Sequence, residues 1–115
     1  MSEKPPTAFI DDEGIGVIMG GVREFYIRWS EIRTVAVEVI SYGGVTSEAF
    51  WWVEGSNPIE GSPAFFAPVE LIANSELVNH YLSSLPNFDH AAFQRALEAE
   101  ENCGEGVYQC WAFDK

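Results

Sequence analysis

The feature that most constrains the fold is a pair of alternating runs between Glu24 and Ile40. Every second residue in each run is apolar, and a strand points successive side chains to opposite faces. Each run therefore predicts one strand with a continuous apolar face. The four residues 30–33 are short enough for a tight turn, so we expect two antiparallel strands joined there, with Ile32 pointing inward. The apolar members of the runs are Phe25, Ile27, Trp29, Val35, Val37 and Val39.

Shorter strand signals lie on both sides of these runs. Gly20-Gly21 is typical of a hairpin turn leading into the first run, and Ser41-Tyr42-Gly43-Gly44 ends the second. Prolines flank Phe65-Phe66, which favours a short strand at an edge, because proline cannot donate to a strand ladder. The further strands are expected at residues 8–10, 15–19, 48–54, 65–66 and 107–113.

The pattern changes to helical spacing between residues 74 and 101. Asn74 or Ser75 can cap a first helix that Pro86 ends, and Asp89 can cap a second one. Strands followed by helices predict an α+β fold: a mostly antiparallel curled sheet or half-barrel of about six to seven strands, with two short helices near the C-terminus. The predicted apolar stripes of the helices are Leu77, Val78, Tyr81, Leu82 and Leu85, then Ala92, Phe93, Ala96 and Leu97.

Length and composition indicate one domain with a real core. At 115 residues, with 47% hydrophobic and 14% aromatic residues, the chain suits a single globular unit over residues 8–115, preceded by a flexible arm over residues 1–7. No apolar run approaches the roughly 20 residues that span a bilayer. The N-terminus lacks the plan of a signal peptide, so we expect a cytoplasmic protein.

Charge narrows the range of partners. Eighteen acidic residues against six basic ones give a net charge of −12 and a pI of about 4.3. Phosphate contacts require Lys and Arg, so nucleic acid and anionic membrane are disfavoured as partners. The balance suits either solubility alone or a basic protein partner.

Motifs for chemistry are absent from the sequence. It has no Gly-x-Ser-x-Gly elbow and no glycine-rich phosphate loop. His80 is expected to be half-buried or exposed, and His90 is expected to be exposed. Cys103 and Cys110 are expected to be free thiols in a reducing compartment, and a hairpin disulfide between them would need an oxidising one. Neither the two histidines nor the two cysteines have the spacing of metal ligands, so we predict no metal and no cofactor. A non-enzymatic role is favoured.

The segment Ile27-Arg28-Trp29-Ser30-Glu31-Ile32 resembles the bacterial pleckstrin-homology-like (GRAM-like) small domains. The resemblance covers about residues 8–97 and implies a small barrel in which the isoleucine packs inside. Such domains usually end on one long helix, whereas this chain predicts two short helices and a strand. The early turns, Asp-Asp-Glu-Gly and Gly-Gly-Val-Arg, lack the basic residues of phosphoinositide binders, so lipid binding is not implied. Residues 85–89 also look like the helix-helix junction of small bacterial proteins of unknown function, some of them immunity-like.

The strand at residues 48–54 supplies the candidate binding residues. Trp51 and Trp52 are adjacent and cannot both face one core. One of them, with Phe50 or Tyr42, is predicted to floor a binding patch, unless a covering layer hides that second face. Trp29 and Trp111 fit core registers and are predicted to be structural.

Three functions follow as hypotheses. The first is an interaction module that binds a protein or peptide through the aromatic strand and an acidic rim. The second is an acidic inhibitor or immunity-type protein that neutralises a basic effector. The third is a small-ligand binder or enzyme with a pocket between sheet and helices near His80. A further copy of the chain is also a possible partner.

Overall fold

The computed structural model describes residues 7–55, 65–70 and 75–113. The predicted arm falls outside these residues except for Thr7, which begins the first strand; the predicted cap at Asn74 also falls outside them. Within the described residues the fold is α+β, with seven strands and two helices. They are β1 (Thr7–Ile10), β2 (Gly14–Met19), β3 (Val22–Arg28), β4 (Ile32–Tyr42), β5 (Thr46–Gly55), β6 (Phe65–Pro68), α1 (Ser75–Ser83), α2 (His90–Glu101) and β7 (Gly106–Ala112).

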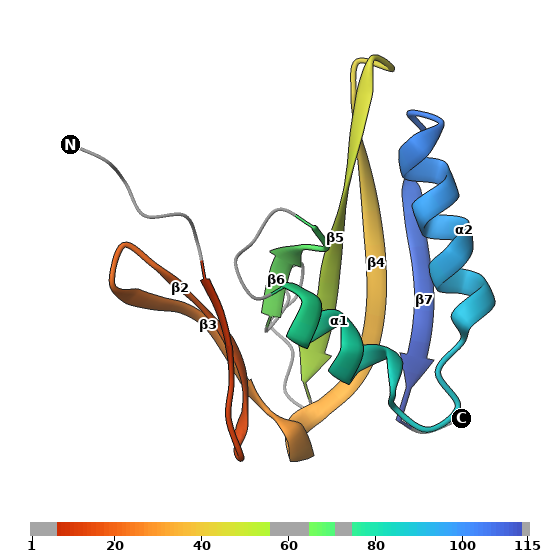
Figure 1. Cartoon of the computed structure of the whole chain (residues 1–115). Helices are drawn as coiled ribbons and strands as arrows, with labels where there is room; N and C mark the ends of the chain where they lie inside the picture. Colours follow the sequence, from red (N-terminus) through yellow and green to blue (C-terminus); the bar gives the residue numbers. More distant parts are fainter. Residues whose placement is uncertain (1–6, 56–64, 71–74, 114–115) are drawn as a thin grey trace.

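The strands divide between two antiparallel sheets (Figure 1). Sheet A has the order β1-β2-β3, and sheet B has the order β6-β5-β4-β7. The α+β class is therefore confirmed, but the strands form two separate sheets in place of one curled sheet. In Figure 1 sheet A lies to the left, near the β6 edge of sheet B, and α2 lies along β7 at the opposite edge.

The predicted hairpin between residues 24 and 40 is wrong. The strand β3 pairs with β2, and a 3-10 turn at Trp29–Glu31 carries the chain out of sheet A and into β4 of sheet B. Strand β4 is already flanked by β5 and β7. Ile32 is buried at this bend, as expected, and fixes the corner between the sheets. Alternation specifies that a strand exists but not which strand lies beside it.

One face of sheet B, which we call the inner face, forms the core with sheet A and both helices. Helix α2 packs on β4, β5 and β7, and α1 packs against β1. At the centre lies Trp51, fully buried, with its ring stacked on Phe93 and its Nε1–H donated to Oδ1 of Asn79. The inner face is made of Val35, Val37, Val39, Ala49, Trp51, Val53, Phe65, Ala67 and Cys110.

The two helices begin and pack mostly as predicted. The Asp89 carboxylate accepts from the backbone N–H of Ala92 and caps α2, as expected. On α1 the buried residues are Val78 and Leu82, one turn apart, whereas Leu77 is 59% exposed and its predicted place in the stripe is wrong. The short helix meets the core along a narrower stripe than the spacing indicated. None of the helices in the described ranges is long and apolar enough to cross a membrane.

Both cysteines are free thiols with different surroundings. Cys110 is buried, and desolvation followed by the charge of Asp89 raises its pKa to about 12, whereas Cys103 is only half-buried. The thiolate is the reactive form, and the raised pKa together with the burial of the sulfur keeps that form scarce at Cys110. We therefore expect iodoacetamide to add one group to the folded chain, at Cys103, and two after denaturation. Peptide mass mapping checks this, and rapid native labelling of Cys110 would contradict the buried position.

Candidate functional site

The opposite side of sheet B, the outer face, carries the candidate site. Both described helices lie against the inner face, where their side chains contact Trp51. Alternation along β4, β5, β6 and β7 sends the other half of the side chains to the outer face. The outer face is made of Thr34, Ala36, Glu38, Ile40, Phe50, Trp52, Glu54, Phe66, Val107 and Gln109.

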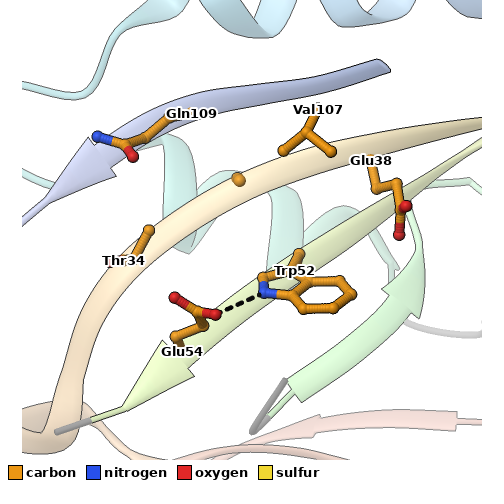
Figure 2. Close-up of a pocket in the computed structure, with 7 residues that line it drawn as sticks. Thr34, Glu38, Trp52, Glu54, Val107 and Gln109 are labelled. Carbon is orange, nitrogen blue, oxygen red and sulfur yellow. Dashed lines mark hydrogen bonds between the residues drawn. The ribbon is translucent and has the colours of Figure 1, made fainter. Parts of the chain in front are cut away.

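Strand register places a hollow at the middle of this face. Gln109, Ala36, Trp52 and Phe66 stand side by side across the four strands. Ala36 has only a methyl group, so the larger Trp52 and Gln109 side chains stand as walls on either side of it. The result is a hollow of about 310 Å³, lined by Thr34, Ala36, Glu38, Trp52, Glu54, Val107 and Gln109 (Figure 2).

An aromatic cluster supports one wall of the hollow. Phe50 stacks on Phe66 with ring centroids 4.8 Å apart, and Trp52 meets Phe66 edge-on at 5.8 Å. The indole Nε1–H of Trp52 donates to Oε2 of Glu54 at 3.2 Å, the contact drawn in Figure 2. These contacts hold the half-buried indole in place without hiding it, so its orientation is set before any ligand arrives.

Two carboxylates bracket the indole along the strands. Glu54 lies beyond Trp52 on β5, and Glu38 stands one cross-strand row away on β4, opposite Phe50. Both are half-buried and line the hollow. An aromatic face between carboxylates is chemistry that recognises a cation, because the ring attracts positive charge and the carboxylates pair with it. A guanidinium suits the arrangement best, since it is planar, stacks on aromatic rings and pairs with carboxylates.

A second hollow adjoins the first. It has a volume of about 330 Å³ and lies where β7 begins. The pairing of β4 with β7 stops at Val39 and Gly106, and β4 continues beyond that pair with no described strand beside it on this side. Glu38 and Val107 line both hollows, and Glu105 adds an exposed carboxylate to the second one. Together the hollows form a groove along β4 and β7 with carboxylates at its two ends and its middle.

The predicted site residues are divided between different parts of the fold. Trp52 and Phe50 lie on the outer face, and Trp51 lies in the core. Tyr42 is 51% exposed near the tip of the β4–β5 hairpin, where its hydroxyl donates to Glu48. Desolvation, and then the charge of the Glu48 carboxylate, raises the pKa of Tyr42 above its usual range. It is not among the residues that line either hollow.

Sequence reasoning missed most of the residues that shape the groove. Ala36 and Glu38 lie on β4 and Gln109 lies on β7, two stretches far apart in the sequence, so their meeting depends on β7 lying beside β4. One signal was present: Glu38 is a charged residue inside an otherwise apolar run, which marks the strand face that is not core. That signal indicates that one face of the strand is not core, but it does not predict which residues of other strands lie beside Glu38.

The alternative chemistry has less support in the geometry. His80 and His90 are both exposed, and neither lines the two hollows. Within the described ranges, no group of three or more His, Cys, Asp or Glu side chains is placed to hold a metal ion. Comparison with known proteins finds no matching family model, no matching curated protein and no matching solved structure.

Proposed function

We propose that this chain is a non-enzymatic interaction module whose outer face binds a basic, partly apolar segment of another protein. The observation that carries the proposal is the half-buried Trp52 indole, held over a hollow between Glu38 and Glu54. Aromatic anchors beside charged groups are the residues that contribute most to protein interfaces. The net charge of −12 attracts a basic partner to the protein, and Glu38 and Glu54 provide pairing groups on this face.

Charge also favours a different protein over a second copy of this chain. An isologous dimer through the outer face would place Glu38, Glu54 and Glu105 against the same carboxylates of the other chain. Like charges brought together in an interface are costly. The homo-oligomer is therefore the weaker alternative for this face.

The face is also a better contact than the exposed edge of β7. The β4–β7 ladder shifts register between Val35 and Ala36, which leaves Cys110 as an extra residue on β7. The carbonyl of Cys110 already accepts from the backbone N–H of Asp89 at 2.7 Å. A peptide pairing along β7 would meet an interrupted edge, because bulges obstruct strand addition.

The inhibitor hypothesis uses the same acidic surface but makes a different prediction about salt. A protein that neutralises a basic effector through charge alone loses affinity steeply as salt screens the surface. The interaction module keeps part of its affinity, because the apolar contacts with Trp52 and Val107 are not screened. The pleckstrin-homology-like relationship, proposed from residues 27–32, is compatible with either function.

Titration with a designed peptide tests the proposal. The probe is the nonapeptide (Arg-Leu-Thr)₃, and the readout is the four indole N–H signals of the nitrogen-15 labelled protein. Those of Trp29, Trp51 and Trp111 are bonded to Asp11, Asn79 and Pro86, away from the outer face. We expect the Trp52 signal to shift most, with binding weakened several-fold, but not abolished, between 50 and 500 mM salt.

Two controls make this titration decisive. The acidic nonapeptide (Glu-Leu-Thr)₃ should leave the Trp52 signal in place. The Trp52→Ala variant, whose binding is followed through the backbone amide signals of β4 and β5, should bind the basic peptide about tenfold more weakly, the scale of an interface anchor. Complete loss of binding at 500 mM salt would favour the electrostatic inhibitor. A basic peptide that leaves the Trp52 signal unmoved would overturn the proposed site.

A further inference from the structure

The two hollows of the groove are spaced along β4 in a way that favours a particular spacing of side chains in the bound peptide, in addition to positive charge. Ala36 is among the residues that line the first hollow and Ile40 is among those that line the second, and alternation along β4 sends both to the outer face. They are four residues apart, about 13 Å at the rise of a strand. Side chains at alternate positions of an extended peptide share one side, so positions one, three and five of a peptide have the same spacing.

The chemistry along the groove alternates in the same way. The first hollow offers Trp52 between Glu54 and Glu38, and the second offers Glu38 and Glu105. Between them stands Val107, which is 67% exposed although it is apolar. Cationic, apolar and cationic side chains would therefore meet acidic, apolar and acidic surroundings in turn.

We propose that the groove reads an extended segment of the pattern basic-x-apolar-x-basic, with arginine at the two outer positions. The first guanidinium stacks on Trp52 and pairs with Glu54 and Glu38, and the second pairs with Glu38 and Glu105. The central side chain covers Val107. This inference rests on the proposed function and names the class of ligand, which is a peptide segment recognised by the spacing of its charged side chains.

Ala36 sets the specificity of the first hollow. It is 4% exposed and forms the floor between Trp52 and Gln109. A leucine there would fill the space that the first arginine needs, while the three carboxylates and the net charge stay unchanged. Ala36→Leu therefore separates a shaped pocket from a merely acidic surface.

Two peptides of identical composition test the spacing. Ac-Arg-Thr-Leu-Thr-Arg-NH₂ places both arginines on one side of an extended chain, and Ac-Arg-Thr-Leu-Arg-Thr-NH₂ places them on opposite sides. We expect the first to bind about tenfold more tightly, as measured by titration of the Trp52 indole signal, because only it uses both hollows. Glu105→Gln should reduce this preference to about twofold, the scale left when one pairing group is lost.

A matched variant on α2 controls for the loss of charge at Glu105. Glu98→Gln removes the same charge from an exposed position on α2 and should keep the full preference. Equal affinity for the two pentapeptides, with the nonapeptide still shifting Trp52, would overturn the spacing while the proposed function stands. If neither pentapeptide nor the nonapeptide shifts Trp52, both proposals fail. Ala36→Leu should lower affinity for the matched pentapeptide, and unchanged affinity would place the arginine elsewhere.

Discussion

Trp51→Ala is expected to lower the free energy of unfolding by about 3–5 kcal/mol, the cost of removing a large aromatic side chain from a packed core. Trp51 has no exposed surface, stacks on Phe93 at 5.1 Å and meets Phe88 edge-on at 6.3 Å. The truncation also leaves the Asn79 amide oxygen without the indole donor at 2.6 Å, which adds a desolvation cost. Thermal denaturation should show a drop of roughly 10–20 °C.

The adjacent residue provides the matched control. Trp52 is half-buried on the outer face, so Trp52→Ala should cost only about 1 kcal/mol. Trp51→Phe keeps an aromatic ring but loses the indole donor to Asn79, and its cost should fall between those of the two alanine variants. Similar losses for Trp51→Ala and Trp52→Ala would show that the outer face is covered as completely as the core.

These two residues also show how far the sequence alone can lead. Their adjacency requires opposite faces of one strand, a consequence of backbone geometry that any strand obeys. Which of them is buried depends on where the helices dock. Asn79 on α1 and Phe93 on α2 reach Trp51, and neither contact can be derived from the alternation in β5.

The wrong hairpin has the same origin. Residues 24–40 contain two genuine strands, β3 and β4, and a real turn at Trp29–Glu31. Local spacing predicted both strands and a turn at residues 30–33, although Trp29, predicted to lie in the first strand, begins the turn. Local spacing reports on each strand separately. Pairing is decided over longer distances, where β7, at the end of the chain, occupies a place beside β4. The groove was missed for the same reason, since β4 and β7 build it together.

The positions of the charges on the outer face, and not the total charge of the chain, should decide whether a basic or an acidic peptide binds. The inner face of sheet B is uniformly apolar, and the two glutamates that bracket Trp52 are half-buried. Carboxylates so placed are partly desolvated and interact more strongly than those on a helix surface. Glu38 and Glu54 should therefore decide partner choice, while most of the other acidic residues set solubility.

Reversing these two charges should reverse the choice of ligand. In the double variant Glu38→Lys/Glu54→Lys, we expect affinity for (Arg-Leu-Thr)₃ to fall by at least about tenfold, because like charges are brought together. The acidic nonapeptide (Glu-Leu-Thr)₃ should now shift the Trp52 indole signal, since the apolar contacts of the face are retained. Peptide titration followed by nitrogen-15 spectra measures both effects, and thermal denaturation confirms that the variant is folded.

A second double variant separates local from total charge. Glu98→Lys/Glu101→Lys makes the same change, two units for each residue and from −12 to −8 overall, at exposed positions of α2 on the other side of sheet B. It should keep its preference for the basic peptide and lose only a small part of the affinity, through weaker long-range attraction. If both double variants lost binding equally, net charge and not the geometry around Trp52 would select the partner, and the electrostatic inhibitor would become the better description.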